Sequence, residues 1–480
     1  MGARFLNYLL TPYLTLKLSS AGYGEMSLVY AAIPFLNVIF TYGLETAFFR
    51  FSQKENNTGK VYDTTMVSII TSTVLLTLAL LFFRKDIAAL ALVENHPEYI
   101  SWMALIIAFD ALSALPFALL RQQGRPIKFA MVRISGILIN ILSVVFFISY
   151  LPSLAEKNPD SPLLWIYTPG NEVGYVIIAN LIQAFCTLLF LSKEFLSFKW
   201  KFDTALWKEI MIYTLPLTIV GLGGVINETM DRLMLGWLLP LSEQQIKVET
   251  GIYSAVYKLS ILITLFVQAF RMGAEPFFFK QAGEGNAQKT YARVMKFFVI
   301  AVTGMFLVVA LYLDIWKHFI RNPIQWEGLK VVPILLLANI FLGIYYNLSI
   351  WYKLSGRTRA GATITLTGAA ITLLVNFFFI PMFSYVASAW ATFLCYGTMM
   401  VISYTWGQKV YPIPYATKKL LAYIVIVVIL FFLHKGGVAL WQNQLFSFIL
   451  ATLLLGAYGL FILKVERKEF RKLPVIGKYL

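Results

Sequence analysis

The stretch NETMDRLMLGWLLPLSEQQIKVETGIYSAVYKLSILITLFVQAFRMGAEPFFFK, residues 227–280, decides the fold of this chain. Two apolar runs flank one short polar connection, and each run is predicted to form a helix. The first helix is expected to end at Asp231-Arg232, and the second to start at Gly251. Three charged residues stand inside the second run: Lys258, Arg271 and Glu275.

Helices this apolar are typical of membrane spans. A charged side chain near the centre of a bilayer costs about 2.5 to 3.5 kcal/mol, so a charge that is kept there needs a function. Transport of a charged molecule is one such function.

The rest of the chain has the same character. Of its 480 residues, 59% are hydrophobic and 13% are charged, whereas about a quarter of the residues of a soluble domain are charged. Apolar runs of about 20 residues, enough to cross a hydrocarbon core, recur along the whole length. They predict an all-α integral membrane protein with about fourteen spans, at residues 1–18, 26–49, 61–83, 99–120, 129–151, 173–192, 208–239, 251–279, 293–313, 330–352, 360–382, 385–406, 418–434 and 444–463.

The net charge of +16 is distributed as a membrane protein requires. Over alternate connections, 27 basic residues fall on one side of the predicted membrane and nine on the other. Basic residues accumulate on the cytoplasmic side, so both termini are predicted to be cytoplasmic. This rule explains the charge without a nucleic-acid partner. The chain starts without a small-residue cleavage site, so no removable signal peptide is expected.

Enzymatic functions find little support in the sequence. The three histidines, His96, His318 and His434, are isolated, so no metal site is predicted, and no cofactor is expected. A Gly-x-x-x-x-Gly-Lys-Ser/Thr loop is absent, which argues against an ATP-driven exporter. The longest predicted outer loop, about residues 151–172, is poor in the carboxylates and histidines expected of a membrane polysaccharide polymerase.

The amino-acid sequence contains an internal repeat. Identical residues recur at an offset of 227, in the pairs Gly24/Gly251, Ser27/Ser254, Tyr30/Tyr257, Ala47/Ala274 and Phe51/Phe278. Upstream of these pairs, where the offset is 228, Arg4 is aligned with Arg232. The repeat pairs the first two spans with the seventh and eighth. It predicts two six-helix lobes of the same orientation. We expect an N-lobe in residues 1–200, a C-lobe in 201–410, and two further helices with a basic tail in 411–480.

Several segments together form a family pattern. They are Arg4-Phe5-Leu6-Asn7-Tyr8-Leu9-Leu10-Thr11-Pro12, Tyr23-Gly24, Ser27-Leu28-Val29-Tyr30, Tyr42-Gly43-Leu44-Glu45-Thr46-Ala47-Phe48-Phe49-Arg50-Phe51, Asp231-Arg232-Leu233, Gly251-Ile252-Tyr253-Ser254 and Ala269-Phe270-Arg271. In these segments and in its span layout the chain resembles bacterial Wzx-like polysaccharide flippases of the multidrug/oligosaccharidyl-lipid/polysaccharide (MOP) exporter superfamily. It departs from them in its first span, which is usually longer and has a basic cytoplasmic lead.

The resemblance implies a transport function in the bacterial inner membrane. Such proteins move an undecaprenyl-pyrophosphate-linked oligosaccharide from the cytoplasmic to the periplasmic leaflet by alternating access, for O-antigen, capsule or exopolysaccharide biosynthesis. The implied partners are the lipid-linked oligosaccharide, membrane lipids, a coupling cation (H⁺ or Na⁺) and the polysaccharide polymerase machinery.

A pyrophosphate substrate requires cations inside the spans. Arginine suits phosphate because its planar guanidinium gives two parallel charge-assisted hydrogen bonds. The candidates are the four cations within spans, expected to face one cavity: Arg4, Arg232, Lys258 and Arg271. The structural alternative is pairing, of Asp231 with Arg232 or Lys258 and of Glu275 with Arg271 four residues before it. Phosphate binding and carboxylate pairing both hold if these ion pairs exchange between two states of the protein.

Acidic and amide side chains in the spans allow further roles. A buried carboxylate with a raised pKa can couple transport to protons or sodium, and the candidates are Glu45, Asp110, Asp231 and Glu275. Glu45 and Arg50 are also candidates for a gate near the cytoplasmic end of the second span. Asparagines in apolar runs either contact glycan hydroxyls or, more commonly, bond neighbouring helices: Asn7, Asn37, Asn140, Asn227, Asn339 and Asn376.

Two other functions compete with a flippase. A multidrug/cation antiporter of the same superfamily would favour an acidic, aromatic cavity over a cationic one. A membrane polysaccharide polymerase, from a different class, would place an acid and a base in its outer loops.

Overall fold

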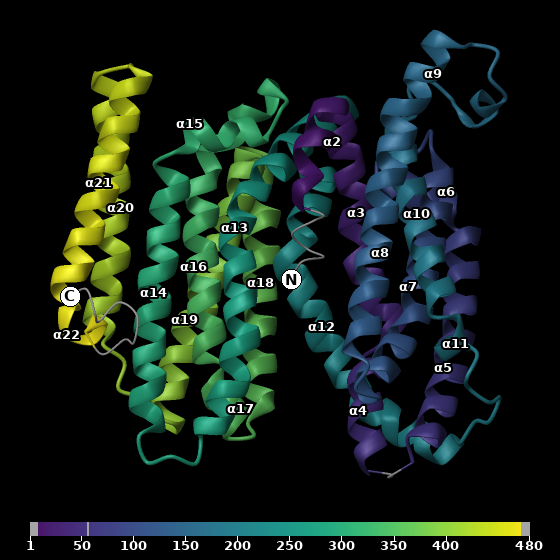
Figure 1. The fold of residues 1–480 in the computed structure, drawn as a ribbon, viewed down its shortest axis with the longest axis horizontal. Coiled ribbons are helices and arrows are strands. Elements are labelled where there is room, and N and C mark those ends of the chain that lie inside the picture. Colours follow the sequence, from purple (N-terminus) through teal and green to yellow (C-terminus); the bar gives the residue numbers. More distant parts are fainter. Residues whose placement is uncertain (1–7, 55–56, 472–480) are drawn as a thin grey trace. The chain divides into compact units, whose positions relative to one another are not determined.

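The computed structural model describes residues 8–54 and 57–471 (Figure 1). Every regular element in these ranges is a helix. Thirteen of the helices are long and apolar enough to cross a membrane. Helices suit such segments because no water is present in the bilayer core to satisfy an exposed backbone. The predicted all-α membrane fold is confirmed. The first predicted span, residues 1–18, lies partly outside the described residues, and α2 (Thr11–Lys17) covers its second half.

The helices follow one another with short connections. Up to residue 238 they are α3 (Ser20–Thr41), α4 (Leu44–Lys54), α5 (Thr58–Phe82), α6 (Arg84–Leu90), α7 (Pro97–Gln122), α8 (Pro126–Val145), η1 (Phe146–Tyr150), α9 (Leu151–Lys157), η2 (Pro162–Ile166), α10 (Glu172–Phe190), α11 (Ser192–Phe195) and α12 (Thr204–Leu238). They continue with α13 (Glu243–Gln281), α14 (Ala287–Ala310), α15 (Leu313–Trp316), η3 (Lys317–Phe319), η4 (Pro323–Val331), α16 (Val332–Leu348), α17 (Ile350–Leu354), α18 (Thr358–Phe383), α19 (Tyr385–Val410), α20 (Thr417–Leu440), α21 (Gln444–Val465) and α22 (Arg467–Phe470).

The helix ends around residues 231–251 correct part of the prediction. Helix α12 continues through Asp231-Arg232 to Leu238, which agrees with the predicted span 208–239 and not with an end at Asp231-Arg232. Helix α13 begins at Glu243, eight residues before Gly251. The extra turns of α13 are polar but paired, since Lys247 Nζ lies 2.8 Å from Glu243 and 3.0 Å from Glu25 of α3. Paired charges let a helix continue where hydropathy alone suggests a loop.

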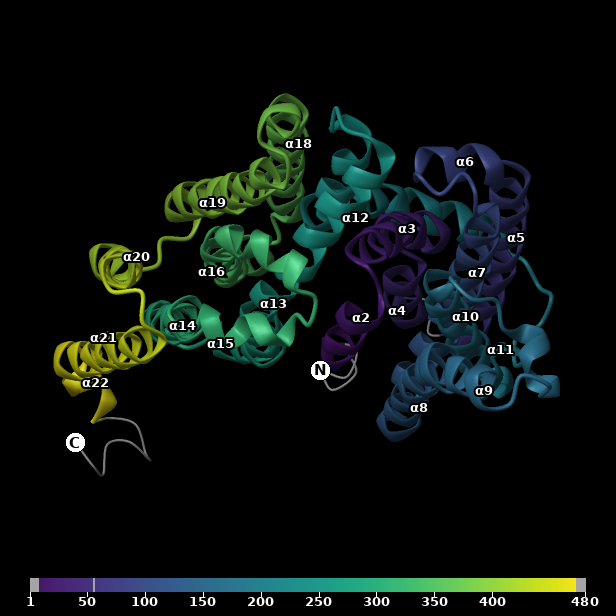
Figure 2. The same ribbon diagram turned by 90° about the horizontal axis from the view of Figure 1, so that it is seen from above.

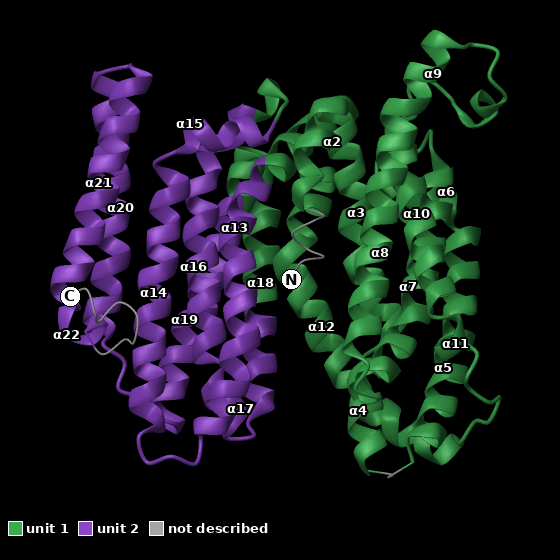
Figure 3. Cartoon of the chain, in the orientation of Figure 1, with its two compact units in different colours: residues 1–255, 321–325, 368–388 green, residues 256–320, 326–367, 389–480 purple. Residues whose placement is uncertain are grey.

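The chain divides by its contacts into two compact units (Figure 3). Unit 1 contains residues 1–255, 321–325 and 368–388, and unit 2 contains residues 256–320, 326–367 and 389–480. The boundary falls inside α13, between Ala255 and Val256. The division into lobes at residues 200 and 410 stays a prediction.

Unit 1 is built around α7, which packs against α3, α4, α5 and α10. At its edge, α3 meets the first turns of α13 through glycine. A Cβ added to Gly24 would overlap the carbonyl of Lys247, and a Cβ added to Gly251 would overlap the carbonyl of Ser20. The two glycines therefore let the backbones of α3 and α13 touch.

In unit 2, α16 lies among α13, α14 and α19, as seen along the helices in Figure 2. Helix α14 also packs against α20 and α21. A buried carboxylate, Glu466, joins these three helices. It lies 2.7 Å from Lys296 Nζ of α14 and 3.0 Å from Lys419 Nζ of α20, and Tyr423 donates a 2.6 Å hydrogen bond to it. The last pair of helices is thus fixed to α14 by charge as well as by apolar packing.

Candidate functional site

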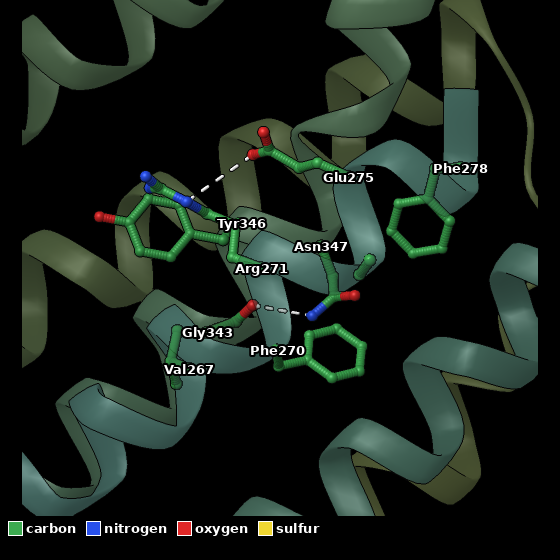
Figure 4. A pocket seen from close by; sticks show the side chains of 9 residues that line it. Val267, Phe270, Arg271, Glu275, Phe278, Gly343, Tyr346 and Asn347 are labelled. Atoms are coloured by element: carbon green, nitrogen blue, oxygen red, sulfur yellow. Dashed lines mark hydrogen bonds and ion pairs between the residues drawn. The ribbon is translucent and has the colours of Figure 1, made fainter. Parts of the chain in front are cut away.

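A recess with a mainly apolar lining and a few charged and polar side chains opens in unit 2 between α13 and α16 (Figure 4). The α13 side is formed by residues spaced three or four apart, which share one face of a helix. The enclosed volume is about 10 Å³, and the rest of the recess is open to its surroundings. We name this site the α13/α16 recess, and its lining is Val267, Phe270, Arg271, Ala274, Glu275, Phe278, Gly343, Tyr346 and Asn347.

Two cations share one carboxylate at the recess. Glu275 Oε1 lies 2.5 Å from Lys353 Nζ and 3.7 Å from Arg271 Nε. The Arg271 guanidinium also lies 4.7 Å from the ring centroid of Tyr346, a cation–π contact. Because one negative charge faces two positive charges, the cluster keeps a surplus of positive charge. The side chain of Arg271 is 38% exposed, so its guanidinium is open to an incoming anion.

Asn347 supplies an unused hydrogen-bond acceptor in the same recess. The residue is 6% exposed, and its Nδ2 donates to the carbonyl of Gly343 at 3.1 Å. A carbonyl only accepts, so the side-chain atom that faces Gly343 must be the nitrogen and the other atom must be Oδ1. Within the described part of the chain, this oxygen has no hydrogen-bond partner. A buried acceptor without a partner is costly, so this oxygen is available to accept a hydrogen bond from a bound molecule.

The back wall of the recess is aromatic and closely packed. Phe270 lies 4.7 Å from Phe298 of α14 between ring centroids. A Cβ added to Gly343 would press on the same Phe298 ring and on Val267. The absence of a side chain at Gly343 therefore lets α16 approach α13 and keeps the recess in shape.

The predicted pair in α12 forms a second cluster, in unit 1. Asp231 is 4% exposed, and it accepts a 2.6 Å hydrogen bond from Tyr253 and lies 3.1 Å from Arg232 Nη1. Arg232 also lies 5.7 Å from the ring centroid of Tyr253. In this conformation the pairing alternative holds for Asp231. An anion that binds Arg232 must displace or adjust this contact.

The gate candidates Glu45 and Arg50 lie on α4, also in unit 1. Glu45 forms an ion pair with Arg121 at the end of α7, and Arg121 lies 5.1 Å from the ring centroid of Phe49. Arg50 does not pair with Glu45; its guanidinium lies 4.2 Å from the ring of Tyr213 on α12. The two residues thus connect α4 to different neighbours.

The four predicted cations do not all belong to the recess. Arg4 lies outside the described residues, and Arg232 belongs to the Asp231 cluster of unit 1. Lys258 is half-buried on α13, thirteen residues before Arg271, which corresponds to about 20 Å along a helix axis. Lys258 and Arg271 are therefore too far apart along α13 to bind one compact anion together, and a shared cavity for all four cations stays a prediction.

Sequence reasoning missed four residues of these clusters: Arg121, Tyr253, Lys353 and Asn347. Arg121 and Lys353 fall in predicted cytoplasmic connections, and hydropathy alone does not show which residues they pair with. Asn347 stands in an apolar run like the asparagines that were singled out, so its signal was present. Of those asparagines, Asn339 bonds the carbonyl of Ser260 across to α13 at 3.2 Å, as a helix-joining residue does.

Comparison with known proteins identifies relatives of this architecture. Residues 1–282 match the sequence profile of the family described as "Polysaccharide biosynthesis protein". No curated protein sequence matches the chain.

Solved structures resemble the chain over most of its length. Lipid II flippase MurJ in an inward closed conformation has a TM-score of 0.67 at 14% sequence identity, over 96% of this chain and 98% of that chain. A multidrug resistance MATE family transporter of the MOP superfamily, inward-facing, has a TM-score of 0.66 at 13% identity, over 88% of this chain and 95% of that chain. At such low identity, these likenesses show the fold.

Proposed function

Because this chain belongs to the polysaccharide biosynthesis protein family, we propose that it moves an undecaprenyl-pyrophosphate-linked oligosaccharide across the membrane. The movement runs from the cytoplasmic to the periplasmic leaflet, by alternating access and without a covalent step. The fold shared with a lipid flippase and with MATE transporters supports a transport function.

One observation carries the choice of an anionic substrate: Arg271 and Lys353 share the single carboxylate of Glu275. A cavity that binds cationic drugs would favour the opposite excess. The guanidinium of Arg271 can give two parallel hydrogen bonds to a phosphate, and Tyr346 holds its plane. These features support the α13/α16 recess as a phosphate-binding part of the transport path.

The geometry also suggests how phosphate enters without leaving a bare carboxylate. Glu275 lies 1.2 Å closer to Lys353 than to Arg271, at 2.5 Å against 3.7 Å. When a phosphate takes Arg271, Glu275 keeps Lys353 as its partner. On release, Arg271 returns to Glu275, so the carboxylate has a cationic partner at either stage.

The wider setting follows from the same proposal. The protein lies in the bacterial inner membrane with both termini in the cytoplasm, and it supplies the polysaccharide polymerase machinery with repeat units. Arg232 and Lys258 contact the phosphates at other depths, and Asp231 or Glu45 couples transport to H⁺ or Na⁺. Reactivity of cysteines placed near each terminus with a membrane-impermeant reagent tests the topology.

Deletion of the gene tests the function directly. Lipid-linked repeat units are expected to accumulate on the cytoplasmic leaflet, and surface polysaccharide to fall. Normal surface polysaccharide with raised sensitivity to cationic dyes would contradict the proposal and favour a multidrug antiporter. A loss of polymerised lipid-linked glycan, without accumulation of repeat units on the cytoplasmic leaflet, would favour a polymerase.

Complementation of the deletion strain tests the residues. Arg271→Glu is expected to abolish transport, because it places two carboxylates at the recess mouth. Arg84→Glu, a change of the same charge in a predicted outer connection, is the matched control and is expected to retain transport. Full transport by Arg232→Glu would remove Arg232 from the phosphate-binding set without touching the recess.

A further inference from the structure

The two units contain the same ion pair at matching places. In unit 1, Glu45 of α4 pairs with Arg121 at the end of α7. In unit 2, Glu275 of α13 pairs with Lys353 of α17. Both glutamates follow a glycine by two residues, and both are followed by two phenylalanines and a basic residue: Gly43-Leu44-Glu45-Thr46-Ala47-Phe48-Phe49-Arg50 and Gly273-Ala274-Glu275-Pro276-Phe277-Phe278-Phe279-Lys280.

A neighbouring aromatic contact also repeats, with its phenylalanines at an offset of 230 and its tyrosines at 229. Phe48 meets Tyr62 edge to face at 5.8 Å between ring centroids, and Phe278 meets Tyr291 edge to face at 5.1 Å. Phe278 is thus the counterpart of Phe48, at an offset of 230, and not of Phe51, as the offset of 227 predicted.

The cations are matched by the turns that follow them. Three residues after Arg121 stands Gly124 with φ +65°, and three residues after Lys353 stands Gly356 with φ +67°. Both glycines occupy the left-handed region, where a side chain is unfavourable, and both lead into the next long helix. Arg121 and Lys353 are therefore equivalent, at an offset of 232.

This comparison separates what the fold requires from what unit 2 adds. At the offset of 232, the counterpart of Asn347 is Leu115, which is fully buried. Arg271 falls where Tyr42 and Gly43 interrupt the first copy, so it has no counterpart on α4. The helix pair of unit 1 thus packs with an apolar residue at the Asn347 position. The matched ion pairs belong to the architecture, whereas Arg271 and Asn347 are present only in the unit that has the recess.

We propose that Arg271 and Asn347 form one composite subsite for the sugar phosphate at the head of the lipid-linked glycan. This inference rests on the proposed function and adds the substrate group that the recess selects. Arg271 binds the phosphate, and the free Oδ1 of Asn347 accepts a hydrogen bond from a hydroxyl or acetamido N–H of the first sugar (Figure 4).

The chemistry of the recess fits a group with an anion on one side and donors on the other. Both residues line the same recess. Phe270, which is partly exposed, offers an apolar face against which a sugar ring can pack. A bare phosphate would satisfy Arg271 and leave the Asn347 acceptor unpaired, so the site discriminates against it.

Two probes test the assignment with the full-length protein in lipid nanodiscs: undecaprenyl diphosphate, and undecaprenyl diphosphate carrying one N-acetylglucosamine. The wild type is expected to prefer the sugar-bearing probe. Arg271→Thr is expected to weaken both probes by about tenfold, and Asn347→Leu to weaken only the sugar-bearing probe, by about five- to tenfold. Asn347→Leu introduces the residue that unit 1 tolerates at the matching position, and the side chain of Arg271 is 38% exposed. Both variants are therefore expected to fold, which monodisperse elution checks.

Asn339→Leu is the matched control, a buried asparagine of α16 outside the recess lining. It is expected to keep the wild-type preference between probes. The composite subsite is refuted if Asn347→Leu keeps that preference or weakens both probes equally. Such a result leaves the proposed function intact, provided that the wild type binds both probes. Failure of the wild type to bind either probe would instead overturn the proposed function itself.

Discussion

Replacement of Glu466 by glutamine is expected to lower the free energy of unfolding by about 3 kcal/mol, since breaking a buried ion pair costs about 3 to 5 kcal/mol. The carboxylate is 2% exposed and joins α14, α20 and α21. Its partner Lys296 is 12% exposed and would keep only the more distant Glu469, at 3.9 Å, as a counter-charge. Glutamine still offers a carbonyl to Tyr423 and Lys419, so the loss falls at the lower end of the range.

A double-mutant cycle with Lys296→Met isolates the pair. Unfolding in mild detergent, followed by circular dichroism against denaturant, is expected to give a coupling of at least about 1 kcal/mol, because residues in one buried network are not additive. The control pair is Lys54–Glu209, whose side chains are 55% and 56% exposed. Its coupling is expected to stay below about 1 kcal/mol, as for exposed pairs. Additive effects at Glu466 and Lys296 would refute the reasoning.

The same residue predicts a dependence on pH. Burial raises the pKa of Glu466, but hydrogen bonds from Lys296, Tyr423 and Lys419 outweigh it and hold the pKa below its ordinary value. A lowered pKa stabilises the fold fully above the unfolded value of about 4.3 and loses this stabilisation as the pH falls through the folded value. The stability gap between wild type and Glu466→Gln should therefore be constant near neutral pH and narrow in acid. A gap that widens in acid would contradict this sign.

Three further changes follow from contacts described above. Gly251→Ala is expected to destabilise by about 3 kcal/mol, because its Cβ would overlap the backbone of α3, whereas Gly304→Ala, with open space around it, should be neutral or stabilising in the same thermal assay. The single changes Glu275→Lys and Lys353→Glu are each expected to reduce complementation. The double change is expected to restore most of the complementation, because the ion pair is kept with its charges exchanged. If the double variant does not recover complementation, Lys353 is assigned to the substrate. Gly343→Ala should displace the aromatic back wall and weaken binding of both diphosphate probes equally, and a change for only one probe would place this glycine in sugar selection.

The fold could be predicted because its signals are local. An apolar run of about 20 residues indicates a span without knowledge of its neighbours, and the family resemblance, read from short segments, is confirmed by the profile match and by the fold. That α12 continues past Asp231 could not be derived from the charge of this residue. Asp231 is satisfied by Tyr253, 22 residues further on, and such a contact exists only after folding.

The site was predictable in part for the same reason. Arg271 and Glu275 stand four residues apart on one helix, so their contact follows from spacing. Lys353 and Asn347 come from other helices, and nothing in the sequence brings them to α13. The register of the repeat also shifted, because Tyr42 and Gly43 interrupt the first copy with φ +31° and +74° while α13 runs on unbroken.

The contact between Gly24 and Gly251 bears on how the chain arose. The two glycines hold the same place in the two copies of the repeat, so the contact joins a surface to its own counterpart. Identical chains meet in this way across a two-fold axis. An ancestral protein of half the length is therefore expected to have formed a homodimer through this face. Gene duplication and fusion then turned an association that depended on concentration into a permanent one, and left each copy free to diverge.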